Sequence, residues 1–223
     1  LKGDSFNGNK FAGKALENGC SYAVVDAKEK IADDERLIPV DDTLQTLQKL
    51  AALHRDNLKI PFLAITGSNG KTTTKELMVK TLGSRFKVFA TQGNLNNHIG
   101  VPLSILSIMD HDFAIIEMGA NHQGEIDFLC RIAKPDYGII TNIGKAHLEG
   151  FGSLEGIKKT KSELYYYLAE NDGTIFLNGT NETLIELSEH LNIDKISYYA
   201  GKNLMVDGYV KDNIPFLKMR LKF

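Results

Sequence analysis

The hydrophobic pattern of the chain changes near residue 58. Before that point, a short helical pattern and two short apolar runs precede one long amphipathic segment, Thr43 to Arg55. In that segment the apolar positions recur at the spacing that places them on one face of a helix. The polar stretch RDNLKIP then interrupts the pattern. We therefore predict a small α/β unit in residues 1–58 that ends with a helix.

After residue 58, short apolar runs alternate with helical patterns. The predicted strands are FLAIT, KVFA, FAIIEM, YGIITN and GTIFLN. The predicted helices are KTTTKELMVKTLG, PLSILSIM, EIDFLCRIA, LEGIKKTKSELYYYLAE and NETLIELSEHL. Apolar strands that alternate with helices are typical of a parallel sheet covered on both faces. The predicted fold class is α/β, with a mostly parallel sheet flanked by helices, and ligands of such sheets bind beyond the carboxyl ends of the strands.

Composition narrows the class of protein further. Hydrophobic residues make up 43% and charged residues 24% of the 223 positions, as in soluble globular proteins. The net charge of −2 does not favour a nucleic acid or an anionic membrane as the main partner. No apolar segment approaches the ~18 residues of a membrane span. Cys20 and Cys130 stand alone, which fits a reducing compartment, so we expect a cytoplasmic protein that does not insert into membranes.

A glycine-framed turn follows the first apolar strand of the second region. It consists of Gly67, Ser68, Asn69 and Gly70. Glycines allow successive backbone N–H groups to point at one anion, and the helix that follows adds its positive end. Lys71 can reach the outer phosphates of a nucleotide, and the hydroxyl of Thr72 can ligate Mg²⁺. The alternative is an ordinary turn that caps a helix, but the strand, helix and Lys-Thr context favours the compact G-x-x-G-K-T phosphate loop.

Two further side chains are expected at the same edge of the sheet. Glu117 ends the strand FAIIEM, so its carboxylate is a natural Mg²⁺ partner for Thr72. A helix cap or a surface charge is the alternative for this glutamate. His147 follows the next strand in a loop at the ligand edge. A solvated side chain is the ordinary interpretation of such a histidine, and its position favours a functional one.

Longer segments of the chain resemble the Mur ligase family in their order and spacing. They are GSNGKTTTKE, GNLNNHIGVP, EMGANHQGEIDFLCRIAKPD and TNIGKAHLEGFGSLEGIKKTKSE. The opening LKGDSFNGNKFAGKALENGCSYAVVD is similar to the second half of that family's amino-terminal domain. The resemblance implies a partial UDP-substrate-binding domain in residues 1–58 and a partial ATP-binding central domain in residues 59–223. It finds no counterpart of the family's carboxy-terminal domain, so we expect a fragment.

The resemblance also implies an activity. It is strongest to the family members that add D-alanyl-D-alanine to UDP-N-acetylmuramoyl-tripeptide through an acyl phosphate, in peptidoglycan precursor synthesis. The implied cofactors are ATP and Mg²⁺, and the implied partners are the two substrates, with no nucleic acid and no membrane. We expect an ATP-dependent peptide ligase that is a monomer, and little or no ligation by this fragment alone.

The family's functional residues can be matched to positions of this chain. The resemblance implies that Lys71 holds phosphates, that Thr72 and Glu117 hold a first Mg²⁺, and that His147 helps hold a second. Lys161 matches a lysine that several members carry as a carbamate, a metal-side ligand. The implied catalytic residues are Lys71, His147 and Lys161. The implied nucleotide site is Gly67, Ser68, Asn69, Gly70, Lys71, Thr72, Thr73 and Asn142, and the implied substrate residues are Asn94, Asn96 and Asn97.

Alternatives remain open for these residues and for the function. The asparagines could equally be turn formers, a frequent role of this residue. A solvated helix lysine is the ordinary interpretation of Lys161. For the whole chain, the alternatives are a folylpolyglutamate-synthase-like ligase, a plain nucleotide-binding or ATP-hydrolysing module, and a non-enzymatic scaffold that binds a UDP-sugar.

Overall fold

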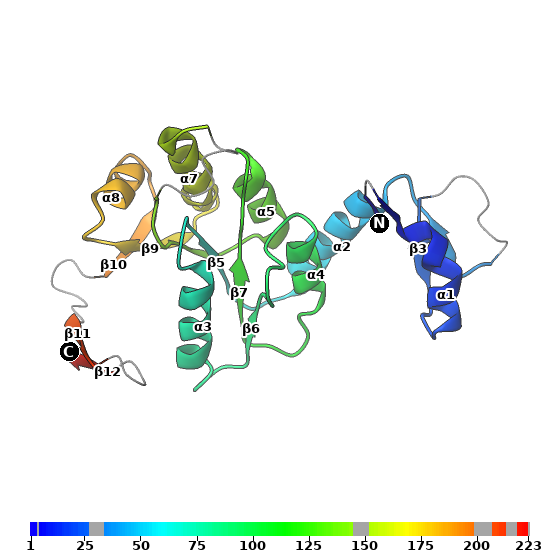
Figure 1. Cartoon of the computed structure of the whole chain (residues 1–223), viewed down its shortest axis with the longest axis horizontal. Helices are drawn as coiled ribbons and strands as arrows, with labels where there is room; N and C mark the ends of the chain where they lie inside the picture. Colours follow the sequence, from blue (N-terminus) through cyan, green and yellow to red (C-terminus); the bar gives the residue numbers. More distant parts are fainter. Residues whose placement is uncertain (4, 27–33, 145–151, 199–206, 213–217, 223) are drawn as a thin grey trace.

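A six-stranded parallel sheet forms the centre of the molecule (Figure 1). The computed structural model describes every residue except 4, 27–33, 145–151, 199–206, 213–217 and 223. The strands are β5 (Phe62–Thr66), β6 (Val88–Ala90), β7 (Phe113–Glu117), β8 (Tyr137–Ile140), β9 (Thr174–Asn178) and β10 (Asp194–Tyr198). They lie in the order β10-β9-β8-β5-β7-β6, and all neighbours pair in parallel. The predicted α/β fold is confirmed.

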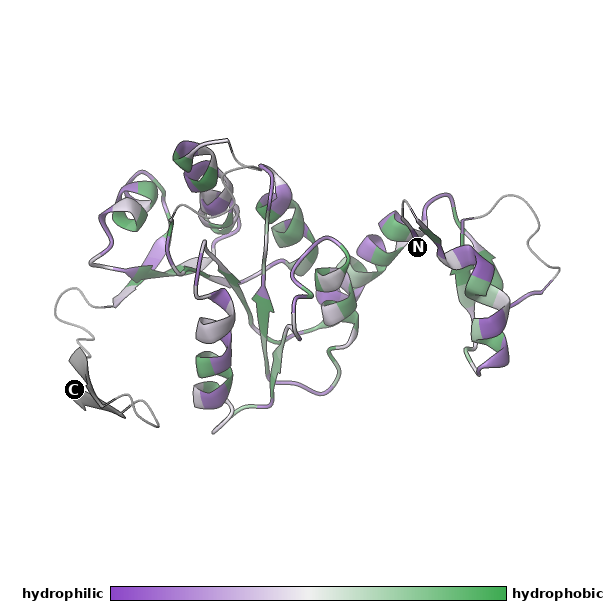
Figure 2. Cartoon of the chain, in the orientation of Figure 1, coloured by the Kyte–Doolittle hydropathy of each residue, from purple (hydrophilic) through white to green (hydrophobic). Residues whose placement is uncertain are grey.

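Helices pack on both faces of this sheet. They are α3 (Lys71–Leu82), α4 (Gly100–Leu106), α5 (Glu125–Ala133), α7 (Leu154–Glu170) and α8 (Glu182–Glu189). Along β5, Phe62 and Ala64 join the core formed with α4, α5 and α7, while Leu63 and Ile65 join the core that α3 covers. Every residue of β5 is therefore buried, which explains its continuous apolar sequence. In Figure 2 the central strands are green, whereas the helices carry both colours.

The first part of the chain forms a smaller unit at one end of the elongated molecule (Figure 1). It contains β1 (Lys2–Gly3), β2 (Phe6–Asn7), a 3₁₀ turn η1 (Gly8–Phe11), α1 (Ala12–Glu17), β3 (Ala23–Val25) and β4 (Leu37–Pro39). The long helix α2 (Thr43–Asn57) leads from it to the sheet. Asp26 ties the unit to this helix, because its carboxylate accepts hydrogen bonds from Asn9 and from the Thr43 hydroxyl. Among the described residues, no helix is both long and apolar enough to cross a membrane.

Some elements differ from the sequence prediction, and α4 and β10 show why. We predicted a helix at PLSILSIM, but α4 begins two residues earlier, at Gly100, and ends at Leu106. Proline fits the first turn of a helix, so Pro102 marks the start only approximately. We did not predict β10, because its sequence DKISY is largely exposed and lacks a buried apolar run. At the end of the chain, β12 (Lys218–Lys222) pairs antiparallel with the preceding β11 (Asp207–Asp212).

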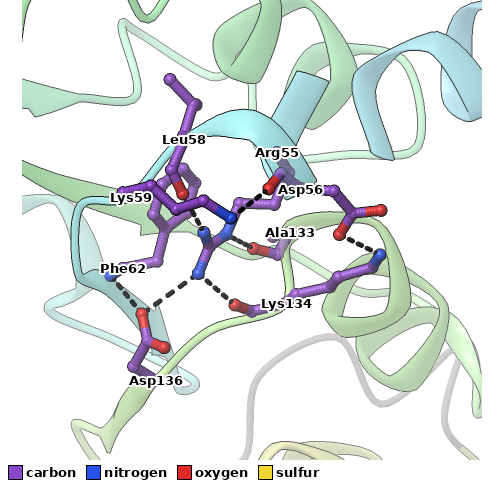
Figure 3. A network of polar contacts seen from close by, with 8 residues as sticks. All are labelled: Arg55, Asp56, Leu58, Lys59, Phe62, Ala133, Lys134 and Asp136. Carbon is purple, nitrogen blue, oxygen red and sulfur yellow. Dashed lines mark hydrogen bonds and ion pairs between the residues drawn. The ribbon is translucent and has the colours of Figure 1, made fainter. Parts of the chain in front are cut away.

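Arg55 joins α2 to the amino-terminal edge of the sheet (Figure 3). Its buried guanidinium donates hydrogen bonds to three backbone carbonyls, those of Leu58, Ala133 and Lys134, at 3.1, 2.9 and 2.8 Å. It also pairs with Asp136 at 3.1 Å and lies 3.9 Å from the centre of the Phe62 ring. The Asp136 carboxylate in turn accepts the N–H of Phe62. One side chain therefore fixes the end of α2, the end of α5 and the start of β5.

Replacing Arg55 should be costly for this reason. In Arg55→Met, three carbonyls and the Asp136 carboxylate lose the hydrogen bonds that the guanidinium donates, so we expect a loss of about 3 kcal/mol or more in the free energy of unfolding. Urea unfolding followed by circular dichroism measures the loss. Lys59→Met, at an exposed neighbouring position, is the matched control and should change stability by no more than ~0.5 kcal/mol. Equal losses in the two variants would contradict this role of Arg55.

Candidate functional site

The glycine turn between β5 and α3 has the backbone geometry that the sequence predicted. Gly67 has φ 141° and Gly70 has φ 78°, both in the region that favours glycine. A Cβ atom at Gly67 would lie 2.0 Å from the hydroxyl oxygen of Thr141, so no larger residue fits there. Gly70 directly precedes α3, and the helix begins at Lys71. The turn therefore presents the positive end of α3 at the carboxyl edge of the sheet.

The segment after β8 holds this turn in place. The N–H of Ser68 donates to the backbone carbonyl of Asn142 at 3.0 Å. The side chain of Asn142 accepts the N–H of Asn69 at 3.1 Å and donates back to the Asn69 carbonyl at 3.0 Å. Thr141 adds a hydroxyl hydrogen bond to the same carbonyl at 2.6 Å. Asn142 thus positions the turn, and its direct contact with a nucleotide stays a prediction.

Lys71 lies across the turn. Its ammonium donates to the carbonyl of Gly67 at 2.9 Å, so the charge sits directly over the glycine turn. Partial burial lowers the pKa of Lys71, and the nearby Glu117 carboxylate opposes that shift. Thr73, in the same turn of α3, is exposed.

Glu117 is a buried carboxylate at the end of β7, with only 1% of its surface exposed. The hydroxyl of Thr72 donates to its Oε2 atom at 3.0 Å, and the amide of Asn96 donates to its Oε1 atom at 2.9 Å. Octahedral Mg²⁺ binds oxygen at ~2.0–2.1 Å, which separates adjacent ligands by about 3 Å. The separation of the Thr72 and Glu117 oxygens therefore fits two neighbouring Mg²⁺ ligands.

Other protein ligands are few at this point. In the part of the chain that the structure describes, no three or more His, Cys, Asp or Glu side chains gather as a metal site. The hydroxyl of Thr72 and the carboxylate of Glu117 suit Mg²⁺, because this ion keeps several waters and is commonly held by one or two carboxylates together with phosphate oxygens. The residues present fit a magnesium ion that arrives with a nucleotide.

The asparagine loop, residues Asn94 to Asn97, follows β6, and its side chains have different roles. Asn96 accepts the N–H of Gly119 on its backbone carbonyl and holds Glu117 with its side chain. Asn97 accepts the N–H groups of Ile99 and Gly100 at 3.1 and 2.8 Å, so its side chain shapes the start of α4. Asn97 is therefore a turn former, as one interpretation of the sequence had it. Contact between these asparagines and a substrate stays a prediction.

A cavity of about 720 Å³ opens beside the glycine turn. Seven of the residues predicted from the sequence line it: Gly67, Ser68, Lys71, Asn94, Asn96, Asn97 and Lys161. The other described residues of the predicted site do not line it: Asn69, Gly70, Thr72, Thr73, Glu117 and Asn142. Residues that the sequence analysis did not single out also line it, among them Glu125 and Phe128 of α5. The fold thus brings the glycine turn, the asparagine loop and Lys161 to one opening.

Lys161 is buried on α7, with 3% of its surface exposed. A solvated helix lysine is therefore the wrong interpretation of this residue. Burial, helped by the positive charge of Lys71, lowers the pKa of Lys161 to about 8, while Glu163 and Glu125 act in the opposite direction. His147 lies outside the described residues.

The sequence analysis missed two charged residues near the site. Glu163 on α7 accepts the N–H groups of Gly124, Ile126 and Asp127 at 2.6, 3.1 and 3.0 Å, and so caps the start of α5 from a neighbouring helix. No local sequence pattern predicts a helix cap whose side chain lies 39 residues along the chain from the N–H group it accepts. Lys75 on α3 is fully buried beside Glu117. Its position four residues after Lys71, on the same helix face, was an available signal.

A parallel sheet with a glycine turn, a lysine, a threonine hydroxyl and a buried carboxylate at its carboxyl edge defines a P-loop nucleotide-binding protein. The model of the Mur ligase middle domain matches residues 65–216. The chain belongs to the Mur ligase family.

Individual relatives agree with this assignment. UDP-N-acetylmuramoyl-tripeptide--D-alanyl-D-alanine ligase of Bacillus subtilis (strain 168) is 41% identical over 179 residues, which are 79% of this chain and 39% of the relative. MurF ligase from Thermotoga maritima, solved in complex with ADP, superimposes with a TM-score of 0.84 at 30% identity, over 99% of this chain and 53% of that one. MurF from Acinetobacter baumannii superimposes with a TM-score of 0.81 at 35% identity, over 94% of this chain and 47% of that one. The chain thus spans about half the length of these solved relatives.

Gly67→Ala tests the geometry of the turn. The added methyl group would meet the Thr141 hydroxyl at 2.0 Å in a backbone conformation that alanine rarely adopts, so we expect a loss of at least ~2 kcal/mol in the free energy of unfolding. Gly13→Ala is the matched control, because its Cβ would meet nothing within 4 Å in the helix α1. That variant should be neutral or slightly more stable. Urea unfolding compares them, and an unaffected Gly67→Ala protein would exclude the close contact.

Proposed function

We propose that the chain carries the ATP site of a ligase that joins D-alanyl-D-alanine to UDP-N-acetylmuramoyl-tripeptide in peptidoglycan precursor synthesis. The observation that carries the proposal is the pair of oxygens formed by the Thr72 hydroxyl and the Glu117 carboxylate. Lys71 lies close by, across the glycine turn, and the cavity opens beside that turn. The substrates are those in the name of the Bacillus subtilis relative, UDP-N-acetylmuramoyl-tripeptide--D-alanyl-D-alanine ligase.

The proposed reaction has two steps. First, a carboxylate oxygen of the tripeptide forms a bond to the γ-phosphorus of ATP, and the bond between that phosphorus and ADP breaks. Then the amine nitrogen of D-alanyl-D-alanine forms the amide bond to the acyl carbon, phosphate leaves, and the nitrogen loses a proton. Phosphoryl transfer depends mainly on positioning and charge neutralisation, so a general base is not required for the first step.

Residues of this chain can supply the positioning. Lys71 and the start of α3 bind the outer phosphates, with the turn held by Asn142. Thr72 and Glu117 would hold Mg²⁺, which when bound neutralises phosphate charge and orients the nucleotide. The cavity beside Lys71, lined by Asn94 and Asn96, would receive the tripeptide carboxylate.

The division of labour along the chain follows the same proposal. Residues 1–58 would bind the UDP part of the substrate, and residues 59–223 would bind ATP. Two observations support the division: α2 ends at Asn57, and β5 begins the central sheet at Phe62. His147 would complete a second metal site.

Lys161 would act as a carbamate in this enzyme. It lines the cavity together with Lys71, and two ammonium groups beside a metal site would repel the metal. A carbamate forms when a neutral amine nitrogen bonds to the carbon of CO₂ and loses a proton, and the resulting anionic oxygen pair suits Mg²⁺. The lowered pKa of Lys161, about 8, supports this chemistry because it increases the fraction of neutral amine near pH 7.

Lys71→Ala tests the nucleotide role. A charge-assisted hydrogen bond to phosphate is worth ~1.5–3 kcal/mol, so the affinity of the chain for a fluorescent ADP analogue in Mg²⁺ should fall about 10- to 100-fold. Lys80→Ala, an exposed lysine on the same helix, is the control and should bind like wild type. Equal binding by wild type and Lys71→Ala would remove the turn from the mechanism.

The ligase activity can be tested with a chimera. In it, this chain replaces the matching segment of the Bacillus subtilis relative. With ATP, Mg²⁺, UDP-N-acetylmuramoyl-tripeptide and D-alanyl-D-alanine, we expect amide formation that Lys71→Ala reduces by orders of magnitude. Phosphate release that ignores both amide-forming substrates would instead support a plain ATPase.

Lys161→Ala tests the carbamate. Wild-type chain in ¹³C-bicarbonate should give a carbamate carbon signal by NMR that is absent from Lys161→Ala. Lys159→Ala, an exposed lysine of the same helix, should retain the signal. Lys161→Ala in the chimera should lose activity and recover part of it with added acetate. An unimpaired Lys161→Ala chimera would contradict the proposal.

A further inference from the structure

Lys75 is a buried charge that the proposed mechanism does not use. It lies in the middle of α3 with 1% of its surface exposed. Its ammonium donates to the carbonyl of Thr91 at 2.7 Å and lies 3.9 Å from the Oε2 atom of Glu117. Burial of an ammonium costs several kcal/mol unless an opposite charge compensates it. The position therefore requires a partner of negative charge.

Two carboxylates are close enough to be that partner. Glu76 lies 3.3 Å away, but 62% of its side chain is exposed, so water screens the interaction. The side chain of Glu117 is only 2% exposed, like that of Lys75 itself. Two opposite charges that are both buried at this distance compensate each other far more than an exposed pair does. Glu117 is therefore the effective counter-charge of Lys75.

Lys75 also joins three segments of the site. Thr91, whose carbonyl it binds, directly follows β6 and precedes the asparagine loop. The hydroxyl of Thr91 accepts the N–H of Glu117 at 3.0 Å. The lysine on α3 thus fixes the start of the asparagine loop and the end of β7 relative to the phosphate-binding turn. Both segments contribute to the position of the Glu117 carboxylate.

We propose that Lys75 is a positioning residue, the internal counter-cation of Glu117. It holds the carboxylate beside Thr72 and balances its charge while no metal is bound. This role of Lys75 rests on the proposed metal role of Glu117. Lys75 and Mg²⁺ share one carboxylate, so the lysine stabilises the metal-free protein and weakens the binding of Mg²⁺.

Removal of the lysine charge should therefore make stability depend on Mg²⁺. Without the ammonium, no positive charge of Lys75 compensates the buried Glu117 carboxylate in the metal-free protein. In the Mg²⁺-bound protein, the metal ion compensates that charge. A ligand that binds only the folded state raises stability in proportion to its affinity. One unit charge near the metal changes the Mg²⁺ affinity by about tenfold in a partly solvated site.

The experiment is thermal unfolding of Lys75→Met and wild type with ADP present throughout, in EDTA and in saturating MgCl₂, because the proposed site takes Mg²⁺ together with a nucleotide. We expect a lower melting temperature than wild type in EDTA, a larger rise on addition of Mg²⁺, and an Mg²⁺ dissociation constant about tenfold lower. Lys80→Met, the same change at an exposed position of α3, should match wild type in both conditions. Lys75→Gln keeps a donor for the Thr91 carbonyl without the charge, and it should behave like Lys75→Met.

The outcomes separate this inference from the function on which it rests. If Mg²⁺ stabilises wild type and Lys75→Met equally, Lys75 is only a structural residue and the inference is overturned, while the metal site stands. If Mg²⁺ stabilises neither protein, the metal role of Glu117 fails as well. If neither variant at position 75 folds even in saturating Mg²⁺, the metal cannot replace the lysine charge, which also overturns the inference.

Discussion

The buried carboxylate of Glu117 is the interaction on which the candidate site depends. It lies at the end of a strand whose other residues are apolar, so the surrounding segments must supply its hydrogen bonds and its counter-charge. Thr72 comes from the first turn of α3, Asn96 from the asparagine loop and Lys75 from the next turn of α3. The same contacts that satisfy a buried charge therefore align the turn, the loop and the strand end around one point.

The opposite edge of the sheet is held by a different device. There the guanidinium of Arg55 binds three carbonyls and Asp136. These contacts join the long helix α2 to the end of α5 and the start of β5. The contacts at this edge stabilise the fold, whereas the candidate site lies at the carboxyl edge. Such a division is usual for open α/β sheets, since the loops that follow the strands hold the ligands.

The sequence predicted those features that local chemistry determines. The bounds of α5 and α7 agree with the predicted segments, because a change of periodicity and, for α7, the Ser153 cap mark their ends. The glycine turn was readable because its residues have one structural use. The roles of Glu163 and Arg55 depend on partners far along the chain, and no local pattern gives those. β10 was missed because an exposed edge strand needs little apolar sequence.

The central claim is that Glu117 and Thr72 hold the metal of a bound nucleotide. Calorimetric titration of ADP into wild type and Glu117→Gln, each with Mg²⁺ and with EDTA, tests it most directly. Glutamine is nearly isosteric but carries no charge to attract a cation. The account predicts that Mg²⁺ strengthens ADP binding to wild type at least tenfold more than it does to Glu117→Gln. The same Mg²⁺ dependence in both proteins would contradict it.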